Sequence, residues 1–141
     1  MRIAVRRQYH ERRGAATIEF VLSLPLLILV VLGCVDVGRF ALKYICLTSA
    51  TSEGAAFASL NAPGKFGGTG NWIAAVQQRA ITESPSIDPP LTPADITVDL
   101  SVLELGRVSV QAQCSFETLV IWPGLPHVWS MSRTVVMAQT P

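Results

Sequence analysis

The sequence lacks the residue patterns by which enzymes and metal-binding domains are commonly recognised. It has only two histidines, and it contains no Cys-x-x-Cys, His-Glu-x-x-His, phosphate-loop or Gly-x-Ser-x-Gly pattern. His127 follows Pro126 and lies close to Trp129, so we interpret it as a loop residue rather than a ligand. We therefore expect no enzyme activity, no bound metal and no cofactor.

Charged side chains are missing from residues 20–35, where Ser23 supplies the single polar side chain. Sixteen residues rise only about 24 Å as a helix, so a span across a hydrocarbon core of about 30 Å must extend towards Leu42. The segment is therefore predicted to insert into a membrane. Asp36 and Arg39 would lie near its far edge, where Arg39 extends its charged end outwards and an i, i+3 pairing with Asp36 lowers the desolvation cost of both.

The distribution of charge predicts the orientation. Residues 1–14 hold five arginines and one glutamate, and such basic clusters stay on the cytoplasmic side of a membrane. Everything after Leu42 is then exported, which places His10 and His127 on opposite sides. Residues 15–141 carry a net charge of −3. An exported portion of that charge offers no basic stripe for phosphates, so we expect no nucleic-acid binding.

The junction between Gly14 and Ala15 precedes the apolar run, and Glu19 is the fifth residue counted from Ala15. This arrangement resembles the class III or type IV prepilin signal, in which a membrane aspartyl peptidase cuts after glycine and leaves the apolar segment on the mature protein. The strings GAATIEF and GCVDVGR, with Pro25 between them, resemble the TadE-like family of pseudopilins from Flp/Tad (tight adherence) pilus systems. The resemblance covers about residues 13–56, and the residues in register are Gly14, Glu19, Phe20, Pro25, Asp36, Gly38 and Arg39.

The resemblance implies a minor pilin or pseudopilin that acts in pilus assembly at the bacterial inner membrane, either within the filament or only priming it. Gly14 and Ala15 would be substrate residues of a prepilin peptidase. Phe20 stands where major Flp pilins usually have tyrosine, which favours a minor subunit, and those pilins are much shorter. The implied partners are the prepilin peptidase, other Tad pilins or pseudopilins, the inner-membrane assembly platform and the lipid bilayer.

Glu19 is the one ionisable residue for which the resemblance implies a mechanism. In pilins the acid at this position is thought to pair with the α-amino group of a neighbouring subunit. The alternative is an interfacial carboxylate that Arg12 or Arg13 neutralises or that water hydrates.

Two other interpretations remain open. Val31-Leu32-Gly33-Cys34 resembles a lipobox, in which Cys34 would be lipidated and residues 1–33 lost, although Leu32 stands where a small residue is usual. An uncleaved single-span anchor with a small β-rich binding module would instead keep Met1. The first residue of the mature protein separates these alternatives from the pilin.

The three cysteines have different predicted surroundings. Cys34 lies in the apolar run, where a thiol behaves as a small hydrophobe. Cys46 and Cys114 would both be exported into an oxidising compartment, and a disulfide between them would join the helix to the distal β region. Two buried free thiols are the alternative, because cysteines far apart in sequence show no proximity.

Breaker residues divide the chain. A transmembrane and stalk helix is expected over residues 15–62, with a bend at Pro25. Residues 63–93 contain Gly- and Pro-rich linkers around a short helix over 72–83, which Asn71 is predicted to cap.

Apolar residues alternate with polar ones in the last part of the chain, residues 94–141. This period of two predicts strands over 96–102 and 108–116 as an antiparallel hairpin that turns near Gly106. WPGLP, at 122–126, is predicted as a loop, and residues 132–139 as a third strand. Three strands need a cover for their apolar face, which the helices over 43–62 and 72–83 would supply. The predicted fold is α+β: a long N-terminal transmembrane helix that extends into a small exported domain with a short helix and a three-stranded antiparallel sheet.

Overall fold

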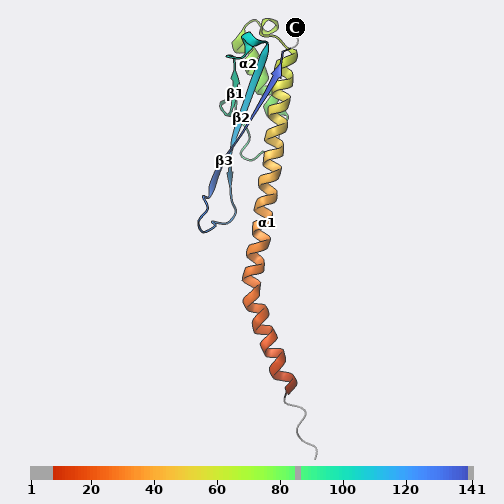
Figure 1. The fold of residues 1–141 in the computed structure, drawn as a ribbon, viewed down its shortest axis with the longest axis vertical. Helices are drawn as coiled ribbons and strands as arrows, with labels where there is room; N and C mark the ends of the chain where they lie inside the picture. The colour runs from red at the N-terminus through yellow and green to blue at the C-terminus, as the bar shows by residue number, and fades with distance from the viewer. Residues whose placement is uncertain (1–7, 85–86, 140–141) are drawn as a thin grey trace, which may run out of the picture. The chain divides into compact units, whose positions relative to one another are not determined.

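The structure is a computed structural model that describes residues 8–84 and 87–139, with side chains from Gly14 onwards apart from Glu104. The chain divides into two compact units, Met1–Gly38 and Arg39–Pro141. Helix α1, Gln8–Leu60, contributes residues to both units (Figure 1). The first seven residues of the predicted basic leader, residues 1–14, lie outside the described residues.

Helix α1 begins earlier than the sequence predicts. Its first residue is Gln8, seven residues before the predicted start at Ala15. Residues 8–13 are rich in Gln, Glu and Arg, which favour helix formation even where no apolar periodicity marks a helix. The helix continues through Pro25 and ends at Leu60, and the bend at Pro25 stays a prediction.

Three antiparallel strands form the sheet of the second unit. They are β1, Ile96–Asp99, β2, Arg107–Glu117, and β3, Val128–Ala138, in the order β1-β2-β3. The register pairs Ile96 with Ala112 and Phe116 with Trp129. This arrangement confirms the predicted α+β fold class. The first strand is shorter than predicted because the chain turns through the 3-10 helix η3, Leu103–Leu105, before Gly106 reverses it at a φ of 66°.

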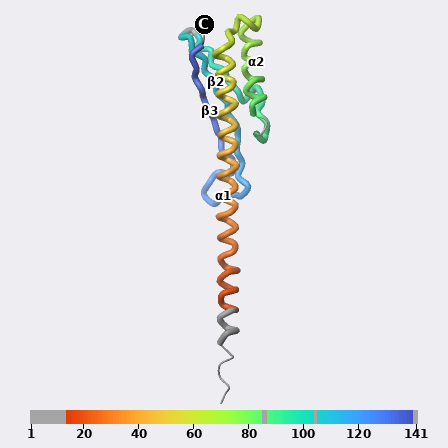
Figure 2. The backbone as a smooth tube through the Cα atoms, turned by 90° about the vertical axis from the view of Figure 1, so that its right-hand side faces the viewer, coloured from red at the N-terminus to blue at the C-terminus, as the bar shows by residue number. Residues whose placement is uncertain are grey.

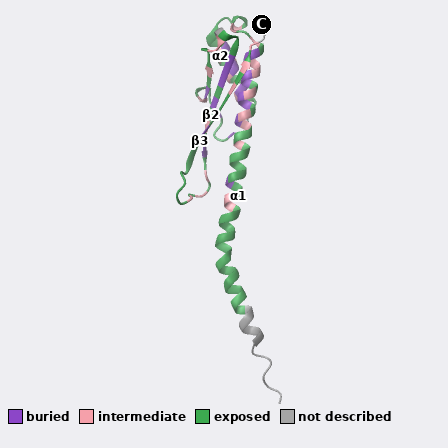
Figure 3. Ribbon diagram, in the orientation of Figure 1, coloured by how far each residue is buried: buried purple, intermediate pink, exposed green. Residues whose placement is uncertain are grey.

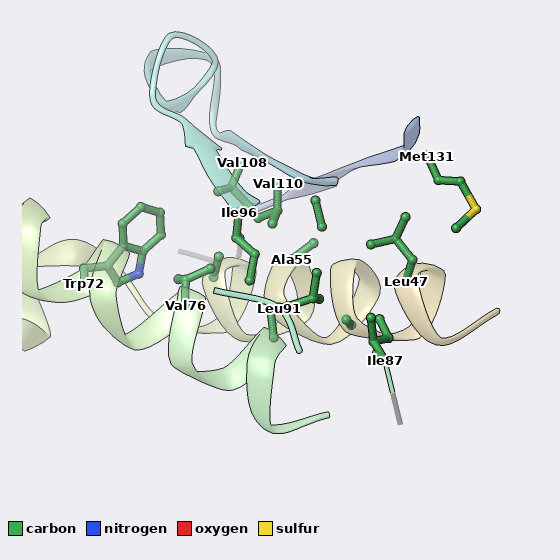
Figure 4. Packing of buried hydrophobic residues seen from close by; sticks show 14 of the residues in the cluster. Leu47, Ala55, Trp72, Val76, Ile87, Leu91, Ile96, Val108, Val110 and Met131 are labelled. Carbon is green, nitrogen blue, oxygen red and sulfur yellow. The ribbon is translucent and has the colours of Figure 1, made fainter. Parts of the chain in front are cut away.

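The core of the second unit lies between this sheet and two helices, α1 and α2, Thr69–Thr82 (Figures 1 and 4). Its buried apolar residues are Leu47, Ala50, Ala55, Ala58, Trp72, Val76, Ala80, Ile87, Leu91, Ile96, Val108, Val110, Ala112, Phe116 and Met131. The helix α2 presents one face to it, since its buried residues recur every fourth position. Trp72, fully buried, satisfies its indole N–H by donating to the carbonyl of Asn61 at 2.6 Å. The predicted helical cover of the sheet is therefore confirmed.

The start of α2 differs from the prediction. The cap is Gly68, and Asn71 lies inside the helix, where its Nδ2 donates to the carbonyl of Phe66 at 3.1 Å. Gly67 and Gly68 have φ values of 72° and 143°, which glycine adopts at no steric cost. The prediction of an Asn71 cap is wrong because this glycine pair, after the 3-10 helix η1, Pro63–Phe66, starts the helix three residues earlier.

At Gly54 the helix α1 comes close to both α2 and β2. A Cβ added there would lie 3.1 Å from the Cβ of Ala80 and 3.6 Å from Cγ1 of Val110. Changing Gly54 to leucine is expected to lower the free energy of unfolding by about 1–3 kcal/mol, since overpacking forces neighbours apart. Chemical unfolding in detergent of the full chain with Trp122→Phe and Trp129→Phe, followed by the emission of the remaining Trp72, measures the change.

The matched control is the change of Gly38 to leucine, because a Cβ at Gly38 meets no described atom within 4 Å. Equal unfolding midpoints for the two variants would show that the helix α1 does not pack at Gly54 as the structure has it.

Candidate functional site

The predicted cleavage junction lies inside helix α1. Gly14 and Ala15 are exposed, and a Cβ at Gly14 would have open space around it among the described residues. Peptidases act on backbone that can enter a groove, so the helix would have to open locally for a peptidase to cut this bond. Glycine lowers the cost of that opening, because it destabilises a helix by about 1 kcal/mol relative to alanine.

Glu19 follows Ala15 by one helical turn. Residues at i and i+4 lie one above the other on a helix surface, so a charge at the α-nitrogen of Ala15 and the carboxylate of Glu19 would share one face of α1. Glu19 is exposed, as is Phe20. Both side chains are thus available to a lipid, a water or a neighbouring chain.

The helix that carries these residues has an uncovered apolar surface (Figure 3). It is long and apolar enough to cross a membrane, with a mean hydropathy of 2.6 in a window of which no part is buried inside the described chain. The exposed large apolar residues of the first unit are Ile18, Phe20, Val21, Leu22, Leu24, Leu26, Leu27, Ile28, Leu29, Val30, Val31, Val35 and Val37. Water-soluble monomers rarely expose an apolar patch of this extent, so this surface requires lipid or protein around it.

The remaining motif residues of the first unit differ in exposure. Pro25 is exposed, whereas Asp36 retains only 5% of its accessible surface. Gly38 has open space around its Cα among the described residues, as Gly14 has. Neither glycine is therefore needed for packing within the described chain, in contrast to Gly54.

Arg39 and Phe40 bind the β2–β3 hairpin within the second unit. The guanidinium carbon of Arg39 lies 5.6 Å from the ring centroid of Phe116, and its Nη1 donates to the carbonyl of Glu117 at 3.4 Å. The rings of Phe40 and Phe116 meet edge to face, with centroids 5.4 Å apart. Sequence reasoning missed these contacts, because no local pattern links residues separated by 78 positions. The predicted pairing of Asp36 with Arg39 stays a prediction.

The three cysteines are free thiols in the structure. Cys34 is exposed, while Cys46 and Cys114 are half-buried and pack against the core of the second unit. A bridge between Cys46 and Cys114 stays a hypothesis.

Burial raises the pKa of the Cys114 thiol above its ordinary value of 9.0, with Asp95 adding to the rise and Lys43 opposing it. The thiolate is the nucleophile, so native Cys114 is expected to react with an alkylating reagent at about pH 8 more slowly than in the unfolded chain. Mass spectrometry after timed labelling in native and urea-unfolded protein measures the ratio.

Equal labelling rates in the two states would contradict the buried thiol, and labelling that requires a reductant would establish the disulfide.

The raised pKa of the Cys114 thiol also fixes the direction in which the stability of the fold changes with pH. The contribution of the neutral thiol is fully present below the unfolded-state pKa and is lost as pH rises through the folded-state pKa, so stability falls in the alkaline range.

Among the described side chains, those of residues 14–84 and 87–139 apart from Glu104, no three His, Cys, Asp or Glu are grouped so that they could hold a metal ion. His127 contributes to a turn instead, since its Nδ1 lies 3.0 Å from the hydroxyl of Thr118.

Residues 14–56 match a family model described as TadE-like protein. The match confirms the resemblance predicted from the sequence and includes Gly14, Glu19, Pro25, Asp36 and Arg39. It ends before α2 and the sheet. No curated protein and no solved structure matches the chain. Residues 14–56 are thus similar to a family of proteins associated with Tad pili.

Proposed function

We propose that the chain is a minor pilin or pseudopilin of a Flp/Tad-type pilus, which a prepilin peptidase cuts after Gly14 and which acts in pilus assembly at the inner membrane. The TadE-like match over residues 14–56 supports the pilus assignment. The observation that carries the finer proposal is the position of Glu19, an exposed carboxylate one turn from Ala15 at the head of an uncovered apolar helix.

The proposed role of Glu19 follows from the cost of its charge. After the cut, Ala15 carries an α-amino group that is mostly cationic near neutral pH. A carboxylate in the first turns of a membrane helix is costly unless it is paired. The amine of a neighbouring subunit supplies the opposite charge, and the apolar surfaces of the two helices then pack side by side. The pair thereby sets the register between subunits.

The proposed topology has the basic leader in the cytoplasm and residues 43–141 exported. The arginines before Gly14 support this orientation, because positive charge stays on the cytoplasmic side. The bilayer surrounds the apolar part of α1, and the second unit, which has its own core, projects from it. The prepilin peptidase, other Tad pilins or pseudopilins and the assembly platform all reside in or act from the same membrane.

An uncleaved single-span anchor with a small binding module is the second candidate. The position of the Gly14–Ala15 bond inside α1 favours it, since a helical bond resists cleavage until the helix opens. An anchor of this kind does not require Glu19 to pair with the amine of a neighbouring subunit. A lipoprotein modified at Cys34 is the third candidate, and it loses Glu19 altogether.

Deletion of the gene tests the proposed function. Cells without the chain are expected to lose surface pili, and expression of the chain from a plasmid is expected to restore them. An affinity tag at the C-terminus is expected to recover Tad pilins or platform proteins from solubilised membranes. Normal piliation in the deletion strain, together with recovery of the chain alone, would refute the role in assembly.

A further inference from the structure

The connection between β2 and β3 has an unusual composition for an exposed loop. Residues 118–132 contain no Asp, Glu, Lys or Arg. We call residues 118–127 of this stretch the apolar loop. The exposed large apolar residues of the loop and of the start of β3 are Leu119, Ile121, Leu125, Val128 and Trp129. Ile121 keeps 77% of its accessible surface, more than any other large apolar residue described.

Hydrogen bonds close the base of the apolar loop and order the turn at its tip. The amide of Thr118 donates to the carbonyl of His127 at 3.1 Å, and the Thr118 hydroxyl lies 3.0 Å from Nδ1 of the same histidine. At the tip, the amide of Leu125 donates to the carbonyl of Trp122 at 3.1 Å. Gly124 has a φ of 86°, and Pro123 precedes it, which is the residue order of a type II turn. The tip therefore holds its apolar side chains outwards on a defined backbone.

The base of the apolar loop is fixed to the first residues of the second unit. Val110, near the start of β2, faces Gly54, whereas Phe116, near its end, meets Phe40 and Arg39. Along β2 the chain thus moves from the α2 end of the unit to the end at Arg39. Figures 1 and 2 show the connection between β2 and β3 beyond that end of the sheet, away from α2.

The same end of the unit lies at the membrane surface if α1 spans the bilayer. About 20 helical residues cross a hydrocarbon core of about 30 Å, and counting from Phe20 the twentieth residue is Arg39. The contacts of Arg39 and Phe40 then hold the base of the apolar loop at the outer boundary of the hydrocarbon. This step rests on the membrane anchoring in the proposed function.

We propose that the apolar loop inserts into the headgroup and acyl-chain boundary of the outer leaflet, as a second membrane contact beside α1. Tryptophan prefers this depth because its ring is apolar while its N–H stays hydrated. Trp122 lies within the loop and Trp129 follows it at the start of β3. The loop carries no charged residue, so its partner is the apolar boundary of the bilayer and not an anionic headgroup. Insertion is therefore independent of the anionic lipid fraction.

The test uses the full chain in phosphatidylcholine vesicles whose acyl chains are brominated near the headgroup, with tryptophan emission as the readout. Bromine is expected to quench part of the wild-type emission, and the same part in vesicles that also contain phosphatidylglycerol. The double variant Trp122→Phe, Trp129→Phe keeps only Trp72, which is fully buried, and is expected to lose the quenching. Ile121→Asp is expected to reduce quenching, and Val136→Asp, an equally charged change at an exposed site at the far end of β3, is expected to leave it unchanged.

Flotation of the vesicles separates the two proposals. A chain that floats but shows no quenching would overturn loop insertion and leave the α1 anchor intact, whereas a chain that does not float would overturn both. Quenching that persists in the double variant would also overturn insertion, since Trp72 would be its source. Emission that shifts to the blue with protein concentration, without quenching, would assign the apolar loop to a second copy of the chain and overturn the lipid contact.

Discussion

Replacing Glu19 with alanine is expected to leave cleavage after Gly14 intact and to reduce incorporation of the chain into pilus complexes about 10-fold to 100-fold. Removing one partner of a desolvated ion pair leaves the other charge uncompensated, at a cost of about 3 kcal/mol in a favourable geometry, and each 1.4 kcal/mol is about tenfold in affinity. Quantitative recovery of Tad components with a C-terminally tagged chain measures the effect.

Two matched variants separate charge from size in this experiment. Glu19→Gln keeps the shape of the side chain and removes its charge, so it is expected to behave as alanine does. Ser23→Ala removes a polar group one turn further along α1, where the Ser23 hydroxyl only donates to the carbonyl of Phe20 at 2.9 Å, and it is expected to have no effect. Normal recovery of Tad components with both Glu19 variants would show that the carboxylate has no part in assembly.

Replacing Gly14 with leucine is expected to abolish processing, so that the full-length chain accumulates in the membrane. A branched side chain before the cut obstructs close approach of the backbone to a peptidase groove. Leucine also favours the helix by about 1 kcal/mol relative to glycine, and this opposes the local opening that the bond inside α1 requires. Intact mass of the membrane-bound chain measures the fraction cut.

Gly38→Leu is the control for the processing experiment. Gly38 is a second helical glycine with open space around it, and it lies 24 residues beyond the cut, so its replacement is expected to leave processing unchanged. A Gly14→Leu variant that still begins at Ala15 would show that processing does not require glycine at residue 14.

The two compact units have different parts in the proposed function. The second unit buries its apolar residues in its own core, with Trp72 and Val110 fully buried. The first unit leaves its apolar residues uncovered and so depends on what surrounds it. This difference explains how one chain holds a folded domain with its own core and also, in the proposed function, offers a helix surface to lipid and to other subunits.

Much of the fold was predictable because strong local signals agree. Alternation from Val108 to Phe116 predicted β2, and the contrast between this period and the glycine-rich and proline-rich stretches placed the elements around it. The start of α1 was missed because residues 8–13 have helix propensity without apolar periodicity. The start of α2 was missed because backbone conformation at Gly67 and Gly68 outweighed the capping preference of Asn71.

The candidate site was predictable as a set of residues and not as a set of contacts. The order of Gly14, Ala15 and Glu19 before an apolar run is visible in the sequence, and the family match covers it. The contacts of Arg39 with Phe116 and Glu117 depend on the path of β2, which no local pattern encodes. The partner of Glu19 belongs to another molecule in the proposed assembly, so a single chain holds only half of that site.

The first residue of the protein that cells retain in the membrane tests the account most directly. N-terminal sequencing and intact mass of the chain, purified from membranes and from sheared pili, are expected to give a protein that begins at Ala15 and has lost residues 1–14. A protein that begins at Met1, or at an acylated Cys34, would contradict a cut after Gly14 and with it the pairing of Glu19 with a neighbouring amine.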